Sequence, residues 1–435
     1  MSFFYKLVKR NVEEEFSEKD YTNKTVQNLI RNYNYLNNLL DNFIEERQIN
    51  SDELLRLIKV ILRNTSLITI KTATDELAMA MFETLNNTGK KLENFYVLKN
   101  DLVITLSEPA VKEKWAKVDS NLENYDPSQF LVSFATLFAG KSTKNNSLSK
   151  IYDYFDKNSK TDMRKLLDKL VIASENYLQI RNPSQLKEHG NLTEIKKYRK
   201  LTTDINVFNV KQHHSLLLAM FMKEKSIAEI NAVLGLILNL SIRNFYFKEK
   251  RANTIEKPIA DLAKDVYNAD LSLEEITRRI GKMIIKDDEL KTAIHGKSVT
   301  TQTDERRLKF ILRETYNEND LKNELEIKQS LSDIHYEHIL PQNPVKDSQW
   351  MKDFPNSEER EKYTRKLGNA TLLLEKLNKN IGNKDFNEKR HKYAESAVPE
   401  NKQLAAKSKW TKKDIDARTA ALADKVINYL DTLSE

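Results

Sequence analysis

The sequence has no cysteine and little glycine or proline, with 8 of each of the latter two in 435 residues. The absence of cysteine excludes disulfides, thiolate nucleophiles and every zinc site that uses cysteine ligands. Any metal must therefore be held by His, Asp, Glu or Asn side chains. Oxygen-rich ligand sets of this kind favour hard ions such as Mg²⁺ or Mn²⁺.

Long hydrophobic runs are also absent. The best candidate for an apolar run, residues 232–240, is far shorter than the roughly 20 residues that span a bilayer. The first residues lack the apolar core and small-residue cleavage site of a signal peptide. With 40% hydrophobic and 31% charged residues, we expect a soluble globular protein in the cytoplasm with no membrane partner, divided into two to four domains.

The charge balance says little about partners. The net charge is +7 from 71 basic and 64 acidic residues, and the pI is near 9.0. A basic balance of this size is compatible with nucleic acid as a partner. The small excess in a Lys- and Asn-rich chain is equally well explained by genome composition.

Helical periodicity dominates the sequence. It predicts helices at residues 25–44, 54–62, 76–85, 93–106, 127–138, 163–180, 212–222, 227–247, 258–267 and 273–285. A β-branched, alternating stretch predicts one strand at 66–72. Ser-, Thr- and Asn-rich stretches at 140–146, 189–191 and 296–303 are predicted loops.

The pattern of apolar and polar residues changes near the C-terminus. Two short β-like stretches, 334–340 and 370–374, are followed by a helix at 385–393 with Asn383 as its N-cap, and by a last helix at 412–433. We therefore predict a mostly α fold with a small strand–strand–helix domain. The predicted domains are 1–110, a helical domain at 111–330, the small domain at 331–395 and a C-terminal helix at 396–435.

Residues in the small domain suit hydrolysis of a phosphodiester. Residues 336–342 read YEHILPQ and contain Glu337 and His338, residues 368–373 read GNATLL, and Asn378 follows. A neutral His can take a proton from water near pH 7. A carboxylate and an amide oxygen can hold one hard divalent ion beside the scissile phosphate and the leaving oxygen.

These strings resemble the two strands of the ββα-metal, or HNH, nuclease fold, and Asn369 and Asn378 have a similar spacing to the family's two asparagines. The resemblance implies that His338 is the general base and that Glu337 and Asn378 bind the metal. It also implies that Asn369 ties down the loop that orients His338. Asn383 and His335 are second-rank candidates, since helix capping explains the first and an exposed strand position the second.

Each of these residues also has an ordinary interpretation. A Glu-His pair is usually an exposed strand pair, and an Asn such as Asn378 usually lies in a solvated loop. Adjacent strand residues face opposite sides, so Glu337 and His338 share one site only if the strand bends. A zinc-hydrolase motif built on His335 and His338 needs a helix and a four-residue spacing, and neither condition is met.

A second resemblance extends further towards the N-terminus. The strings DELA (75–78), MFETLNNTGKKL (81–92) and LKND (98–101) resemble the end of the ParB-like N-terminal domain of GmrSD-type modification-dependent restriction proteins. In that family a helical region and an HNH domain follow, and the tail around Trp410, Ile415 and Arg418 is also similar. This places Asn86, Gly89 and Lys90 near a nucleotide pocket, although a plain helix–turn–helix connection explains them too.

The chain departs from that family at its start. It lacks the Asp-Gly-Gln-Gln-Arg string linked to nucleotide binding and hydrolysis, so only part of the ParB-like domain is predicted. A separate ParB-like subunit would supply the rest, or the chain is a truncated relative. The strand at 66–72 would then have an open edge that invites a partner.

Residues 243–251 mix basic and aromatic side chains. Such stretches can stack on bases and hold phosphates, but a helix with a buried aromatic face and a solvated end is the favoured interpretation.

Two functions follow from the resemblance. The first is a metal-dependent DNA endonuclease in prokaryotic defence, leaving 5′-phosphate and 3′-hydroxyl ends. One such site cuts one strand, so a duplex break needs a homodimer or two events. The second is a non-catalytic subunit that binds DNA or a protein partner.

Overall fold

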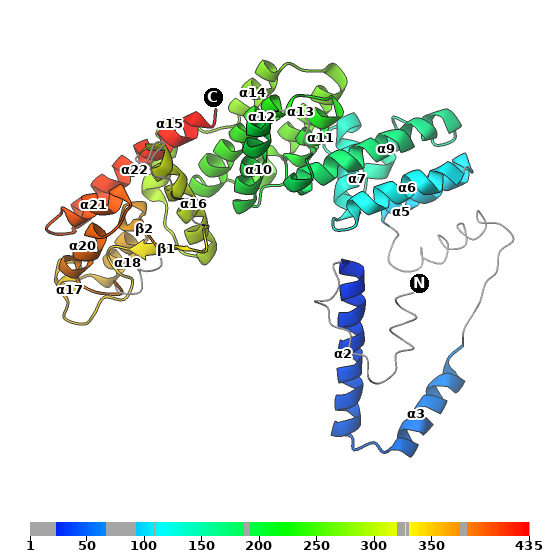
Figure 1. Ribbon diagram of the computed structural model, residues 1–435, viewed down its shortest axis with the longest axis horizontal. Helices are drawn as coiled ribbons and strands as arrows, with labels where there is room; N and C mark the ends of the chain where they lie inside the picture. Colours follow the sequence, from blue (N-terminus) through cyan, green and yellow to red (C-terminus); the bar gives the residue numbers. More distant parts are fainter. Residues whose placement is uncertain are drawn as a thin grey trace. The chain divides into compact units, whose positions relative to one another are not determined.

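The computed structural model describes residues 23–66, 93–107, 109–186, 191–319, 327, 330–374 and 381–434. The described residues are mostly helical with two short strands, which confirms the predicted mostly α class (Figure 1). The chain falls into two compact units, Met1–Leu92 and Glu93–Glu435. The helix predicted at 76–85, nearly all of the strand predicted at 66–72, and Asn86, Gly89, Lys90 and Asn378 lie outside the described residues.

The described part of the first unit consists of α2 (Lys24–Glu46) and α3 (Ser51–Asn64), as periodicity predicts. The side chain of Asn23 caps α2, and Asn50 and Glu53 form a reciprocal capping box at the start of α3. Both helices are amphipathic, yet α3 buries none of its residues. The capping box is therefore the interaction that stabilises the start of α3, since none of its side chains is buried.

The described residues of the second unit begin with a series of helices. Its first twelve α-helices are α5 (Asn94–Leu106), α6 (Pro109–Leu122), α7 (Pro127–Ala139), α8 (Ser147–Tyr152), α9 (Lys160–Arg181), α10 (Leu192–Val207), α11 (His214–Met222), α12 (Ile227–Leu240), α13 (Glu256–Ala269), α14 (Leu273–Gly281), α15 (Asp287–Gly296) and α16 (Gln302–Asn319). Short turns η2 (Pro183–Gln185) and η4 (Ala252–Ile255) join some of them. The helices predicted from 93 to 285 all occur, with ends that differ by a few residues. The helix predicted at 227–247 is the exception, because a π-helical segment ends it.

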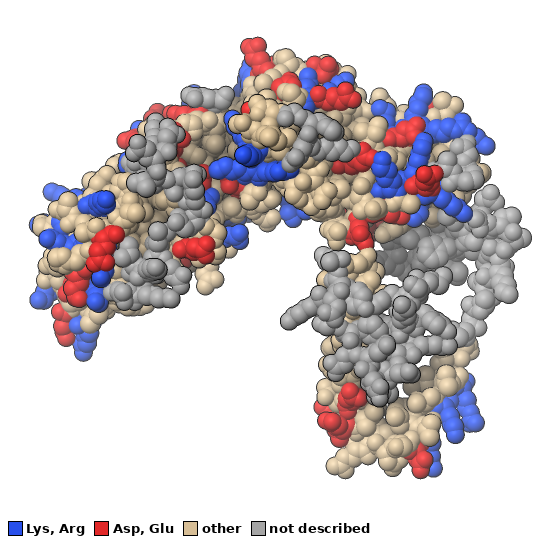
Figure 2. Space-filling view, viewed as in Figure 1, with Lys and Arg blue, Asp and Glu red and all other residues tan. Residues whose placement is uncertain are grey.

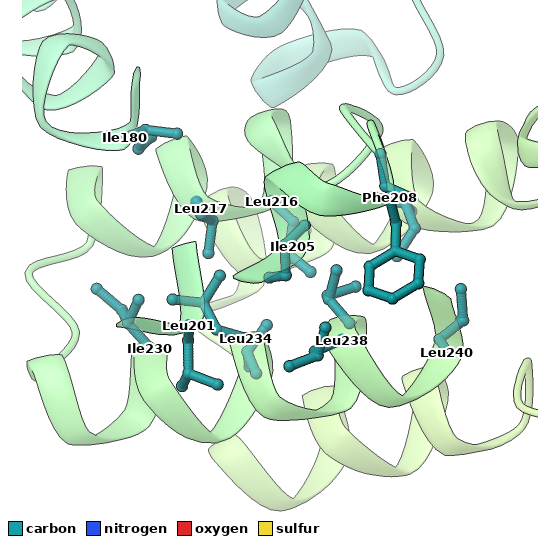
Figure 3. Close-up of a cluster of buried hydrophobic side chains, with 14 of the residues drawn as sticks. Ile180, Leu201, Ile205, Phe208, Leu216, Leu217, Ile230, Leu234, Leu238 and Leu240 are labelled. Atoms are coloured by element: carbon teal, nitrogen blue, oxygen red, sulfur yellow. The ribbon is translucent and has the colours of Figure 1, made fainter. Parts of the chain in front are cut away.

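The large core of this unit lies between its helices. Figure 3 shows part of it, where Leu201 and Ile205 of α10 meet Leu216 of α11 and Leu234 of α12. The helix Ile227–Phe247 is the one described helix long and apolar enough to cross a membrane, but 89% of its apolar window is buried inside the protein. Its composition is therefore explained by its place in this core.

The segment after α12 is a π-helix, η3 (Ser241–Phe247). Arg243, Tyr246 and Phe247 are buried, whereas residues 248–251 are exposed. The Arg243 guanidinium donates to Asp287 at 2.6 Å and to Asp431 at 3.3 Å. This confirms the interpretation of residues 243–251 as a helix with a buried aromatic face and a solvated end.

The C-terminal part contains both strands, β1 (Ile334–His338) and β2 (Ala370–Leu374), which pair antiparallel. The remaining elements are α17 (Gln349–Asp353), α18 (Ser357–Thr364), η5 (Leu367–Asn369), α20 (Phe386–Ala394), α21 (Pro399–Ala405) and α22 (Lys412–Thr432). The first strand ends two residues before its predicted end. The prediction of Asn383 as the N-cap of α20 is wrong, because Asp385 occupies that position. Its carboxylate accepts from the Gln349 backbone instead.

The two strands lie between two hydrophobic cores. Ala370 and Leu372 belong to the large helical core, whereas Leu373 belongs to a second, smaller core with Trp350 and Trp410. Alternate residues of a strand face opposite sides, which explains this division. The small core binds α17, α20, α21 and the start of α22 to the strands. The finer predicted division into 1–110, 111–330, 331–395 and 396–435 stays a prediction.

The last helix connects the strands to the helical part. Residues of η5 pack so closely on α22 that a Cβ on Gly368 would collide with the carbonyl oxygen of Ile415. Further along, α22 contacts α15 and α16, and the Leu430 carbonyl accepts from Asn239 of α12 at 2.8 Å. Because α22 contacts both parts, it links the strand region to the large core.

Candidate functional site

Glu337 lies near the end of β1 and faces α20. It is 7% exposed, and its Oε1 accepts from Nζ of Lys389 at 2.7 Å and from the hydroxyl of Tyr393 at 3.1 Å. Burial raises the pKa of Glu337, while the Lys389 charge opposes that shift. Burial likewise lowers the pKa of Lys389, opposed by Glu337. At 2.7 Å the two side chains form a buried ion pair, in which the charge of each partner offsets part of the desolvation of the other.

His338 is the last residue of β1. Its half-buried ring contacts Tyr336 edge to face, with centroids 4.8 Å apart. Its Nε2 lies 3.3 Å from Nε2 of Gln342, in the turn after the strand. Burial, with a smaller effect from the Lys389 charge, lowers the pKa of His338 to about 4. The imidazole is therefore neutral near pH 7, and burial makes it a weaker base than an ordinary histidine.

Asn369 is fully buried where η5 meets β2. Its Oδ1 accepts from the Leu340 backbone at 2.7 Å, and its Nδ2 donates to the carbonyls of Leu340 at 2.9 Å and Thr364 at 3.0 Å. The Trp410 indole also donates to Oδ1, at 3.2 Å. The backbone directly after His338 is therefore held by this side chain, which satisfies polar groups that burial would otherwise leave unpaired.

The structure brings the predicted residues together only in part. Glu337 and His338 are neighbours on a regular paired strand, and no hydrogen bond or ion pair joins these two side chains, both of which are described. Glu337 faces α20, and the ring of His338 contacts Tyr336, which packs on the large core. Lys389 links them instead, because its Nζ also donates to the His338 carbonyl at 2.7 Å. Asn383 is exposed in the turn before α20.

Among the described residues, one carboxylate oxygen beside His338 is available to a divalent cation. Among them, no three His, Asp or Glu side chains cluster as metal ligands. Glu337 nevertheless offers a hard oxygen, because both side-chain donors go to Oε1 and none in the described part of the chain goes to Oε2. A cation there would share the carboxylate with Lys389 and would need a second ligand. Asn378, the sequence candidate for that ligand, lies outside the described residues.

A groove of about 910 Å³ lies beside the start of β1. Its walls include Arg306, Lys309 and Arg313 of α16, which recur on one helix face, and His335 of the strand. Lys309 donates to the carbonyls of Leu331 and Ile334, and Arg313 pairs with Glu314 at 2.7 Å. Arg306 is exposed, so its charge is the one most accessible from the groove.

The surface charge elsewhere is mixed. Figure 2 shows basic and acidic side chains interspersed over the visible face of the second unit. Many of them form exposed pairs, such as Lys114 with Asp168 and Arg278 with Glu275. The net charge therefore gives no further indication of a nucleic-acid surface.

Sequence reasoning missed Lys389, Tyr393 and the role of Trp410. The spacing of Phe386, Lys389 and Tyr393 puts all three on one face of α20, and all three are buried. A lysine on the apolar face of a helix requires a buried partner, since lysine is almost never fully buried alone. That pattern could have indicated an ionic partner, but not that the partner is Glu337.

Residues 284–425 match the model of the family described as GmrSD restriction endonucleases, C-terminal domain. The match confirms the predicted resemblance to GmrSD-type proteins. No curated protein matches the chain.

Proposed function

We propose that this chain is a metal-dependent HNH endonuclease that hydrolyses DNA within a prokaryotic restriction or anti-phage system in the cytoplasm. The observation that carries the proposal is the position of His338, a neutral imidazole at the end of β1. The buried amide of Asn369 holds the backbone that follows it. The order β1, loop, β2 and α20 is the order expected of a ββα-metal nuclease.

In this proposal each residue has one task. An unprotonated imidazole nitrogen of His338 takes the proton from the attacking water. Glu337 and Asn378 hold one Mg²⁺ or Mn²⁺, which when bound supplies positive charge to the scissile phosphate and the leaving oxygen. Asn369 fixes the turn after His338, and the half-buried setting of the ring limits its access to bulk water.

DNA and partner chains are part of the same proposal. Arg306 and the adjoining groove lie close to β1 and offer positive charge to a DNA backbone. One site cuts one strand, so a homodimer would cut a duplex. A separate ParB-like subunit would supply nucleotide-dependent control.

One observation favours the second function, a non-catalytic subunit that binds DNA or a protein partner. The carboxylate of Glu337 is already paired with Lys389, as in a purely structural ion pair. A chain that has lost its metal would keep such a pair and could still bind through its helical region.

Plasmid nicking separates the two functions. Purified protein is incubated with supercoiled plasmid carrying unmodified or modified bases, with Mg²⁺ or Mn²⁺ and with EDTA. We expect metal-dependent nicking that His338→Ala abolishes and His391→Ala retains, since His391 is exposed on the outer face of α20. Equal nicking by the protein and His338→Ala contradicts the nuclease proposal. DNA binding without nicking favours the non-catalytic subunit.

A further inference from the structure

Lys389 is a buried cation placed between the two residues assigned to chemistry. Its side chain is 1% exposed. Nζ donates to Oε1 of Glu337 at 2.7 Å and to the carbonyl oxygen of His338 at 2.7 Å. A lysine in this setting is held by ionic and hydrogen-bond partners, because an unpaired buried ammonium is strongly disfavoured.

The hydrogen bonds divide the carboxylate of Glu337 into two unlike oxygens. Lys389 and Tyr393 lie four residues apart on one face of α20, so both reach the same oxygen, Oε1. No donor in the described part of the chain reaches Oε2. A cation that binds Glu337 therefore meets one free oxygen and, beside it, a carboxylate oxygen already held by a positive charge.

We propose that Lys389 competes with the metal ion for Glu337, as the resident cation of the metal-free protein. The inference rests on the proposed function, since it takes Glu337 as a metal ligand. Two positive charges that share one buried carboxylate repel each other, and burial leaves this repulsion poorly screened by salt. Lys389 thus raises the concentration of metal ion that is needed to occupy the site at Glu337.

The hydrogen bond from Lys389 to the His338 carbonyl allows such competition. When a cation draws the carboxylate of Glu337 away, Nζ keeps its bond to the His338 carbonyl and is not left without an acceptor. The same bond ties the ammonium to the backbone of the residue assigned as base. A metal that enters the site would therefore change the partners of Lys389 without expelling its charge.

The test measures Mn²⁺ affinity directly, by calorimetry with MnCl₂ on the full chain without DNA. Lys389→Met removes the charge, and Lys392→Met is the matched control, because Lys392 lies on the same helix and pairs with Glu395. Glu337→Gln tests the ligand itself. We expect Lys389→Met to lower the Kd for Mn²⁺ about tenfold, Lys392→Met to leave it unchanged, and Glu337→Gln to raise it at least tenfold.

A second measurement guards against a variant that folds poorly. Lys389→Met leaves a buried carboxylate with Tyr393 alone, so its Tm without metal should fall, and Mn²⁺ should raise that Tm more than it raises the Tm of the unsubstituted protein. Lys389→Gln removes the charge but keeps a donor for the His338 carbonyl. It should shift the Kd in the same direction as Lys389→Met.

The outcomes are distinguishable. An unchanged or raised Kd in both Lys389 variants, with binding lost in Glu337→Gln, overturns the competition but leaves Glu337 as a ligand. Wild-type affinity in Glu337→Gln, or no Mn²⁺ binding by the unsubstituted protein at millimolar concentration, overturns both the competition and the metal site of the proposed function.

Discussion

The side chain of Asn369 forms a closed pair of hydrogen bonds with the backbone of Leu340, accepting from its N–H at 2.7 Å and donating to its carbonyl at 2.9 Å. The two residues are 29 positions apart in the sequence. Through this pair the end of η5 determines the conformation of the chain just after His338. The proposed general base is thus held by a residue that takes no part in proton transfer.

Asn369→Asp tests this pair without changing the size of the side chain. The substitution replaces the donor Nδ2 by an oxygen that faces the carbonyls of Leu340 and Thr364. A buried acceptor or charge without a partner should lower the free energy of unfolding by about 3 kcal/mol. Urea unfolding measures the change, and the exposed Asn383→Asp serves as control. A loss below about 1 kcal/mol would contradict the structural role of the pair.

Gly368→Ala tests the contact between η5 and α22. The added methyl group would collide with the Ile415 carbonyl and with Thr419, and the helix backbone cannot yield without shifting α22. We expect a loss of stability of about 3 kcal/mol. Gly281→Ala is the matched control, since nothing lies within 4 Å of its added methyl group. Thermal or urea unfolding measures the stability of both variants. Equal stability would show that α22 does not pack closely against Gly368.

Histidine burial in the helical core predicts a pH dependence of stability. Burial lowers the pKa of His213 to about 4, below its ordinary value of 6.5, and its Nδ1 is buried without a hydrogen-bond partner. The Arg181 charge adds to this lowering of the pKa, and the ring of His214 lies 4.7 Å away. In the unfolded chain His213 therefore becomes protonated near pH 6.5, whereas in the folded chain it becomes protonated only near pH 4.

The free energy of unfolding should accordingly fall as the pH is lowered through this window. Between pH 7.5 and 5.0, His213 should account for a loss of about 2 kcal/mol. His213→Gln should reduce the pH dependence by that amount, whereas the exposed His295→Gln should not alter it. Urea titrations at the two pH values provide the measurement. If the free energy of unfolding changes equally with pH in the unsubstituted protein and in both variants, His213 is accessible to protons in the folded state.

Arg306→Ala tests whether the groove beside β1 receives DNA. If Arg306 contacts a phosphate, its loss should weaken duplex binding at 0.1 M salt and reduce the slope of log affinity against log salt by about 1. Fluorescence anisotropy at several salt concentrations measures both quantities. Arg278→Ala is the control, because Arg278 is exposed on α14 and paired with Glu275. Equal effects of the two substitutions would place DNA elsewhere.

Local patterns were sufficient for much of the architecture. Periodicity located α2, α7, α9 and α12, because a helix buries one face and its period is visible in any short stretch. The change from a helical to a β-like residue pattern after residue 327 located both strands and, after them, α20. The sequences at 75–101 and around Trp410, Ile415 and Arg418 indicated a GmrSD-type protein, which the match of residues 284–425 supports.

The sequence by itself thus determined the mostly helical class, the order of elements near the C-terminus and the identity of the residues proposed for chemistry. Only the tertiary structure decided their partners, since Lys389 lies 52 residues from Glu337 and Asn369 lies 29 from Leu340. The strength of an ion pair or a hydrogen bond depends on how completely both partners leave water. That burial is a property of packing between distant segments, and no local pattern contains it.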